Sequence, residues 1–297
     1  MTDSHVRDAF WQASCDFPAD LAEAAAYLLA EGLGCPAEVQ DLSTMLRAEN
    51  AEVSVVVLAF DAPPPEDLGP RVEACLAPLG QAPVTLRTRR RDDDWKEGWK
   101  AFFRTTRISD RVAVRPPWEP NDPEAQVHVI IDPGMAFGTG THATTRGVIR
   151  LLDGVLARHP GRPGVPPGRV LDLGTGSGIL AIVAALLGHD AVGVEIDPVA
   201  LENAAHNLRL NGVEDRVRLV EGSVDAVPGP FPGVVANILA GTLIELAAPI
   251  RAQVGADLVL SGILGPQAEA VVAAYPDLRL VERVDDGEWA ILHLAVR

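Results

Sequence analysis

Hydrophobic and polar positions follow a regular succession of short apolar runs and helical stretches from residue 170 to the end of the chain. The apolar runs predict buried strands at residues 170–173, 217–220, 233–236, 257–261 and 278–284, with helices between them. Strands that alternate with helices form a parallel sheet covered on both faces. The turn Asp285-Asp286-Gly287 leads into residues 289–296, so the last two strands are expected to form an antiparallel hairpin.

The pattern of residues 1–90 predicts a separate small domain. Strands are expected at residues 10–17, 37–42, 52–60 and 84–88, and helices after Pro18-Ala19-Asp20 and at residues 66–79. The order strand-helix-strand-strand-helix-strand is that of a ferredoxin-like α+β domain. Because this part has no cluster of catalytic residue types, we interpret it as a substrate-recognition domain.

Residues 91–125 have a different character and are expected to link the two domains. Trp95, Trp99, Phe102 and Phe103 follow a helical spacing, which predicts a connector helix that packs one aromatic face on a neighbour. An aromatic cage for a methylated amine is a weaker alternative. Prolines then mark a turn-rich end to the linker. The remaining residues, 126–297, form the predicted α/β domain.

The composition narrows the class of protein. The 297 residues are 47% hydrophobic, which is enough for a large core, and the formal net charge of −16 disfavours a nucleic-acid substrate. Cys15, Cys35 and Cys75 are far apart, so neither a metal site nor a disulfide framework is expected. The chain has no signal-peptide core and no apolar run of membrane-spanning length, so we expect a cytoplasmic protein.

The most specific motif lies in residues 170–197. An apolar strand runs into Gly174, Gly176 and Gly178, a helix of small residues follows, and the next strand ends in Glu195. Glycines let a ligand approach the N–H groups at a helix start, and the acid can accept hydrogen bonds from ribose hydroxyls. Dinucleotide sites have the spacing G-x-G-x-x-G, whereas this chain has G-x-G-x-G. A turn that merely packs helix on sheet is the alternative.

Two further segments hold candidate site residues. The glycine-rich loop of residues 132–145 precedes the nucleotide-type fold, and we expect it to close over a bound cofactor as a lid. Within it, His142 is expected to cap the next helix or stabilise the loop. Thr144 and Thr145 either cap that helix or contact the cofactor. Asp197, followed by proline, is expected to cap a helix rather than bind ribose.

Asn237 stands at the end of the fourth strand of the predicted sheet. Ligands of open α/β sheets bind at the carboxyl ends of the strands, so Asn237 is expected in the same crevice as Gly174 and Glu195. Its amide offers an acceptor and two donors. It is therefore the candidate group for holding a cofactor and orienting an amine, although an asparagine that bonds its own turn is an alternative.

These segments resemble a known family. The glycine triplet is similar to that of class I methyltransferases, which bind S-adenosylmethionine (AdoMet). The whole chain resembles the bacterial methyltransferases of large-subunit ribosomal protein L-eleven, in the segments 94–103, 132–145, 172–182, 237–240 and 260–264. The resemblance implies a class I Rossmann-like sheet with a C-terminal antiparallel hairpin, preceded by a ferredoxin-like domain.

The resemblance also implies residue roles. The cofactor AdoMet would be held by Thr145, Gly174, Glu195 and Asn237, with Phe137 and Gly176 as further contacts, and Asn237 would be the catalytic residue. This chain departs from the usual family pattern at a few positions: Met135 in place of leucine, Ala143 in place of proline, Thr175 in place of cysteine and Glu195 in place of aspartate. None of these changes removes a needed functional group.

The expected activity is AdoMet-dependent N-methylation of lysine side chains, and of the α-amino group, in ribosomal protein L-eleven. The resemblance implies a substrate that is free of the ribosome, no direct nucleic-acid or membrane partner, and a monomeric enzyme. The alternatives are an N-methyltransferase of another protein or a small amine, a nicotinamide-dependent oxidoreductase, and a non-catalytic binding module. The glycine spacing and the C-terminal hairpin argue against the oxidoreductase, and the intact cofactor residues against the binding module.

Overall fold

The computed structural model describes residues 10–18, 21–35, 37–41, 53–60, 62–80, 85–91, 103–132, 142–158 and 169–297. The chain divides into two compact units, Met1–Phe103 and Arg104–Arg297. Residues 104–125, which the sequence assigned to a linker, belong to the second unit. The expected aromatic helix around Trp95 and Trp99 and the loop that contains Phe137 lie outside the described residues.

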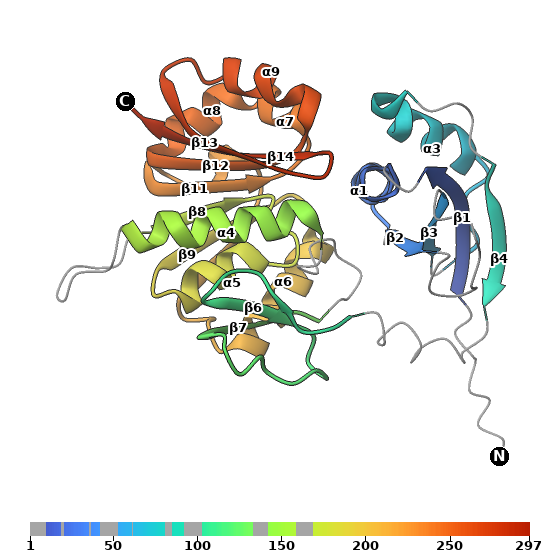
Figure 1. The fold of residues 1–297 in the computed structure, drawn as a ribbon, viewed down its shortest axis with the longest axis horizontal. Helices are drawn as coiled ribbons and strands as arrows, with labels where there is room; N and C mark the ends of the chain where they lie inside the picture. Colours follow the sequence, from blue (N-terminus) through green and yellow to red (C-terminus); the bar gives the residue numbers. More distant parts are fainter. Residues whose placement is uncertain are drawn as a thin grey trace. The chain divides into compact units, whose positions relative to one another are not determined.

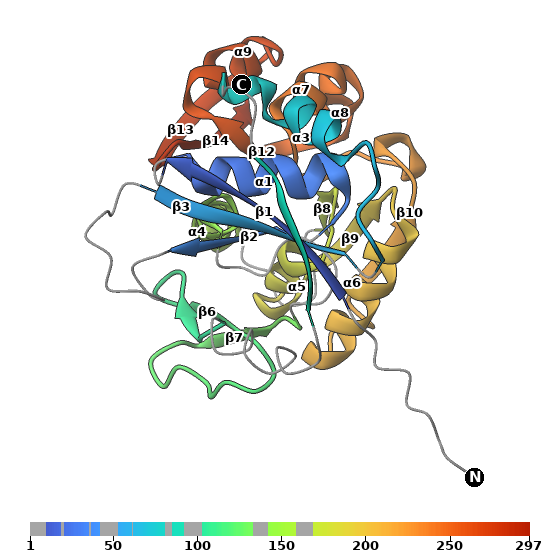
Figure 2. The same ribbon diagram turned by 90° about the vertical axis from the view of Figure 1, so that its right-hand side faces the viewer.

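The first unit is a four-stranded antiparallel sheet with two helices on one face (Figures 1 and 2). Its elements are β1 (Phe10–Pro18), α1 (Ala22–Leu33), β2 (Ala37–Asp41), β3 (Val53–Phe60), α3 (Leu68–Leu76) and β4 (Arg87–Arg91). The strand order is β2-β3-β1-β4. Alternate β1 side chains, among them Cys15 and Phe17, pack with Leu29 of α1 and Val72 of α3 in one core. The predicted ferredoxin-like arrangement is confirmed.

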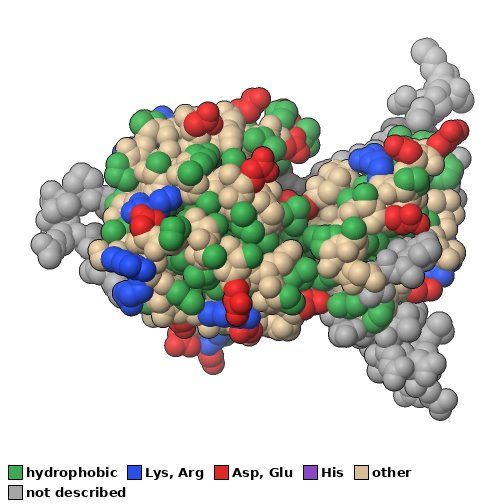
Figure 3. All heavy atoms as spheres, turned by 90° about the horizontal axis from the view of Figure 1, so that it is seen from above, with side chains coloured by type: hydrophobic (Ala, Val, Ile, Leu, Met, Phe, Trp, Pro, Cys, Tyr) green, Lys and Arg blue, Asp and Glu red, His purple; other side chains and the backbone are tan. Residues whose placement is uncertain are grey.

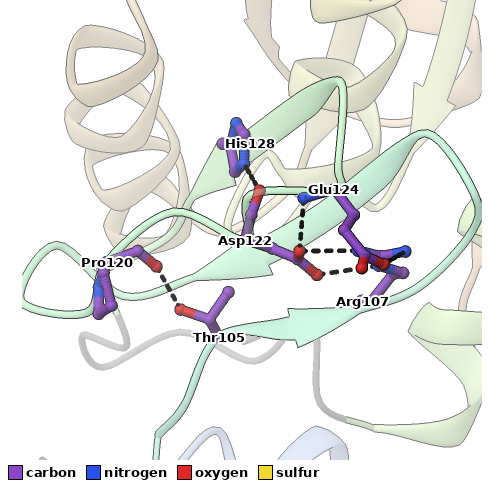
Figure 4. A network of polar contacts seen from close by, with 6 residues as sticks. All are labelled: Thr105, Arg107, Pro120, Asp122, Glu124 and His128. Carbon is purple, nitrogen blue, oxygen red and sulfur yellow. Dashed lines mark hydrogen bonds and ion pairs between the residues drawn. The ribbon is translucent and has the colours of Figure 1, made fainter.

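The second unit begins with a small three-stranded sheet of β5 (Thr106–Arg107), β6 (Val112–Arg115) and β7 (Val127–Ile130). The loop between β6 and β7 is fixed by polar contacts (Figure 4). Arg107 donates two hydrogen bonds to the carboxylate of Asp122, at 2.7 and 2.9 Å, and pairs with Glu124 at 2.8 Å. The bond from Arg107 is the main reason why the pKa of Asp122 falls to about 2.

The rest of the second unit is a seven-stranded sheet between two layers of helices (Figure 1). In chain order its elements are α4 (Ala143–Arg158), β8 (Arg169–Leu173), α5 (Ile179–Leu186), β9 (Asp190–Glu195), α6 (Pro198–Asn211), β10 (Val217–Glu221), β11 (Phe231–Asn237), α7 (Ala240–Glu245), α8 (Ala247–Gln253), β12 (Val254–Leu264), α9 (Ala268–Ala273), β13 (Leu278–Asp286) and β14 (Trp289–Val296).

The strand order is β10-β9-β8-β11-β12-β14-β13. The first five strands are parallel, whereas β14 pairs antiparallel with both β12 and β13. The predicted C-terminal hairpin is therefore confirmed, and so is the α/β class. The order of the strands reverses between β8 and β11, which is where open α/β sheets bind ligands.

Each face of this sheet has its own apolar core. Val235 of β11 and Val259 of β12 face the layer that contains α4 and α5, while Ala236 and Leu260 face the layer that contains α7 and α9. Neighbouring residues in these parts of β11 and β12 therefore face opposite helical layers. On the surface seen in Figure 3, acidic and basic side chains are interspersed among apolar and uncharged polar atoms. None of the helices in the described residues is long and apolar enough to cross a membrane.

Candidate active site

The glycine turn after β8 has the backbone conformation that its sequence predicts. Gly174, Gly176 and Gly178 all have positive φ, at 68°, 52° and 80°. This region favours glycine, because a Cβ crowds the backbone there. At Gly174 a Cβ would also lie only 2.5 Å from Cγ2 of Ile238. The turn therefore needs glycine at Gly174 for both its backbone angle and its contact with the end of β11.

A buried carboxylate, which the sequence analysis did not assign, organises this turn. Asp172 is fully buried, and its Oδ2 accepts hydrogen bonds from the Thr175 hydroxyl at 2.6 Å and the Ala181 N–H at 3.1 Å. Burial raises the pKa of Asp172 to about 7, against the opposing effect of the Thr175 bond. The available sequence signal was an acid inside an apolar strand, two residues before the first glycine.

Glu195 at the end of β9 joins the glycine turn to the next helix. Its Oε2 accepts from the Gly176 N–H at 3.0 Å, and its Oε1 accepts from the N–H groups of Ile196 and Asp197 at 2.8 and 3.2 Å. Asp197 caps α6 by accepting from the Val199 N–H at 2.9 Å. The predicted capping role of Asp197 is confirmed. The carboxylate of Glu195 thus lies directly beside the glycine turn.

Asn237 at the end of β11 contacts the start of α4. Its Nδ2 donates to the hydroxyls of Thr144 and Thr145, at 3.2 and 3.4 Å. Its Oδ1 is buried and has no hydrogen-bond partner within the described part of the protein. A buried polar atom without a partner is costly and needs an explanation such as a ligand. The Asn237 amide is therefore anchored by its nitrogen and leaves its oxygen available.

His142 also contacts the start of α4. Its Nδ1 accepts from the Thr144 N–H at 3.3 Å and lies 2.8 Å from the Thr144 hydroxyl oxygen. The ring also meets Trp289 of β14 edge-on, with 5.2 Å between centroids. The expected capping role of His142 is confirmed. The alternative that Thr144 and Thr145 are the caps is wrong, since both lie buried in the first turn of α4.

The structure thus brings most of the expected site residues to one edge of the sheet. Gly174 and Gly176 follow β8, Glu195 ends β9, and Asn237 ends β11 beside Thr145. Phe137 lies outside the described residues. A turn of positive-φ glycines, a carboxylate beside it and an amide oxygen without a partner among the described residues fit AdoMet, which offers ribose hydroxyls and an amino acid moiety but no pyrophosphate.

Comparisons with known proteins agree with this geometry. The family model described as ribosomal protein L11 methyltransferase (PrmA) matches residues 37–297. A ribosomal protein L11 methyltransferase from Geobacter sulfurreducens is 40% identical over 96% of this chain and 98% of its own length. Another, from Citrifermentans bemidjiense, is 38% identical over 94% of this chain and 95% of its own.

A solved structure is also similar. The crystal structure of a ribosomal protein L11 methylase from Lactobacillus delbrueckii subsp. bulgaricus is 30% identical, with a TM-score of 0.57. The match covers 66% of this chain and 100% of that one. Together with the family model, which spans most of the sequence, these relatives establish that the chain belongs to the ribosomal protein L11 methyltransferase family.

Proposed function

We propose that this protein transfers methyl groups from AdoMet to amines of ribosomal protein L11, namely lysine side chains and the α-amino group. Membership of the family makes the chain an AdoMet-dependent methyltransferase. The geometry of Asn237 is the observation that supports an amine as the methyl acceptor. Its Nδ2 is held by two threonine hydroxyls, so its buried Oδ1 can accept a hydrogen bond from an N–H of the substrate. The following residues, Ile238 and Leu239, are aliphatic and suit a flexible alkyl amine.

The proposed cofactor contacts follow from the same edge of the sheet. Glu195 would accept from the ribose hydroxyls, and the turn at Gly174 and Gly176 would let the cofactor approach the backbone. Thr145 and Asn237 would hold the part of the cofactor that carries the methyl group, and Phe137 would complete the site. AdoMet supplies an electrophilic methyl group on a sulfonium sulfur.

The protein's part in the reaction is to present a neutral amine in line with that methyl group. The nitrogen lone pair would form the new N–C bond as the S–C bond breaks, with the bonding electrons left on sulfur. A lysine amine has a pKa of about 10.4 in water, so the ammonium must first pass one proton to water. Burial at the site and the nearby sulfonium charge both lower that pKa. Orientation by Asn237 is the main catalytic contribution that we assign.

The remaining parts of the proposal concern the partner. The ferredoxin-like unit would capture ribosomal protein L11 free of the ribosome, and the enzyme would act as a cytoplasmic monomer without direct contact to nucleic acid. The absence of a basic sequence bias supports the last point, since the formal net charge is −16.

The test is to incubate the pure protein with radiolabelled AdoMet and total ribosomal proteins from a strain that lacks this methylation. Label in ribosomal protein L11 alone is the expected result. Label in another protein or in a small amine would favour the alternative N-methyltransferase. Tight AdoMet binding without transfer to any component would favour a non-catalytic binding module.

A further inference from the structure

We propose that Ser261 is a second group that positions the target amine, acting beside Asn237. This inference rests on the proposed function and deepens it. Ser261 lies in β12, within a segment that the sequence analysis singled out but to which it gave no role. Its side chain is fully buried, and its hydroxyl oxygen has no hydrogen-bond partner among the described residues.

The strand register places Ser261 next to Asn237. The two residues are direct partners in the parallel pair of β11 and β12. Neighbouring strands lie about 4.8 Å apart, so two side chains on the same face are close neighbours. Val235 and Val259, two residues earlier on each strand, both face the α4 layer. By alternation Asn237 and Ser261 face that layer too, where α4 begins.

A bulge in β12 occurs at this point. In the pairing with β14, Leu260 lies opposite Leu292 while Ile263 lies opposite Ala290, so β12 has one extra residue. Gly262 provides the positive φ, at 78°. Leu260 and Ile263 both face the α7 layer, although their spacing would put them on opposite faces of a regular strand. Bulges are common beside active sites, where they redirect a side chain.

The chemistry of an amine nucleophile explains why two neighbouring buried oxygens lack a hydrogen-bond partner within the part of the chain that the structure describes. A primary amine whose lone pair points to the methyl group has two N–H bonds left, and each needs an acceptor in a buried site. Oδ1 of Asn237 can accept one of them and Oγ of Ser261 the other. Both oxygens are buried, and neither has a hydrogen-bond partner among the described residues.

The assignment predicts how the rate of methyl transfer depends on the number of methyl groups already on the target amine. Each transfer replaces an N–H by an N–CH₃, so a primary amine uses both acceptors and a monomethylated amine uses only one. Loss of the Ser261 hydroxyl should therefore slow the first transfer about 3- to 10-fold, as expected for one neutral hydrogen bond, and slow later transfers less.

The experiment compares wild type with Ser261→Ala. Single-turnover rates on ribosomal protein L11 would be followed by mass spectrometry, so that unmodified, monomethylated and more highly methylated forms are separated. AdoMet affinity would be measured by calorimetry and stability by thermal unfolding without ligand. We expect a slower first transfer, unchanged AdoMet affinity, and a melting temperature equal to or above that of wild type. The last result follows because the variant loses a buried hydroxyl for which the described residues supply no hydrogen-bond partner.

Ser109→Ala is the matched control, since Ser109 is a serine with partners. Its hydroxyl donates to Asp153 at 2.8 Å and accepts from the Val112 N–H at 3.1 Å. This variant should melt at a lower temperature but keep the wild-type pattern of methylated products. If Ser261→Ala does not fold, Ser261→Cys keeps a similar volume with a much weaker acceptor and carries the same kinetic expectation.

Three outcomes would overturn the proposal for Ser261: an unchanged first transfer, weaker AdoMet binding with the rate retained, or an equal slowing of every transfer together with a lower melting temperature. The second would mean that Ser261 serves the amino group of AdoMet. All three presuppose that the wild type methylates ribosomal protein L11. If it does not, the proposed function fails instead.

Discussion

At the scale of single residues, Glu195 is the clearest test of the cofactor site. Its two oxygens accept hydrogen bonds from three backbone N–H groups. Glu195→Ala therefore removes these bonds, one of which holds the glycine turn, as well as the proposed bonds to ribose. Each charge-assisted hydrogen bond contributes about 1.5–3 kcal/mol. We expect AdoMet affinity to fall at least tenfold, measured by titration calorimetry.

Asp197→Ala is the control for that measurement. It removes the cap of α6, which costs about 1 kcal/mol of stability, but leaves the carboxylate of Glu195 in place. AdoMet affinity should change much less than in Glu195→Ala. Wild-type affinity in folded Glu195→Ala protein would show that Glu195 does not bind ribose.

A second residue-scale prediction concerns pH. The pKa of Asp172 is raised to about 7 in the folded protein, above its ordinary value near 4, because the carboxyl is buried. The folded state then binds this proton more tightly than the unfolded state. The contribution of Asp172 to stability is therefore present below about pH 4 and is lost as pH rises towards 7. Three pKa units correspond to at most about 4 kcal/mol.

Asp172→Asn tests this account, because the amide cannot ionise. Chemical denaturation of both proteins between pH 5 and 8 should show that wild type loses stability relative to the variant as pH rises. A constant difference over that range would mean that Asp172 does not titrate there.

At the scale of elements, the loop between β6 and β7 depends on the contacts of Arg107. Arg107→Gln removes the guanidinium whose hydrogen bonds are the main reason why the pKa of Asp122 is lowered to about 2, so this pKa should rise towards its ordinary value. An NMR titration of the Asp122 carboxyl measures the shift directly. Arg104→Gln, which breaks the pair with Glu119, should leave the Asp122 titration unchanged. An unmoved pKa in Arg107→Gln would contradict the proposed cause.

The elements also show what the sequence could predict. Periodicity predicted the α/β sheet, and the Asp285–Gly287 turn predicted the antiparallel hairpin, because both patterns are local. Residues 104–125 were assigned to a linker because they are rich in charge and proline. Their structure comes instead from the pairing of β6 with β5 and β7 in a small sheet, and from paired side chains such as Arg107 with Asp122, which no periodicity reveals.

In the candidate site, too, some residues could be predicted from the sequence and others only from the structure. Glycine spacing and a strand-terminal acid pointed to Gly174 and Glu195, and the end of the fourth strand pointed to Asn237. The contribution of Asp172 depends on burial, and that of Ser261 depends on register and a bulge in β12. These are properties of the folded chain. The requirement for glycine at Gly174 likewise includes a contact with Ile238 that only the structure shows.

At the scale of the whole molecule, we predict separate roles for the two units. A chain that begins at Arg104 contains Thr145, Gly174, Glu195 and Asn237, and should bind AdoMet with nearly wild-type affinity. It should lose most activity on intact ribosomal protein L11, because a separate capture domain raises the local concentration of the target amine. Kinetics at increasing substrate concentration should show the loss mainly in KM.

One result with the shortened chain would contradict a recognition role for the first unit. If the shortened protein folds and methylates ribosomal protein L11 as fast as the full chain, the ferredoxin-like unit is not a recognition domain. Its role would then be limited to stability or solubility of the full chain.

The most direct test of the account is mass spectrometry of purified ribosomal protein L11 after incubation with AdoMet and either wild type or Asn237→Ala, with AdoMet affinity measured in parallel. We predict methyl groups on lysine side chains and the α-amino group with wild type. With Asn237→Ala, the turnover rate at saturating AdoMet should fall by a larger factor than AdoMet affinity. No methylation by AdoMet-bound wild type, or an unchanged turnover rate in Asn237→Ala, would contradict the account.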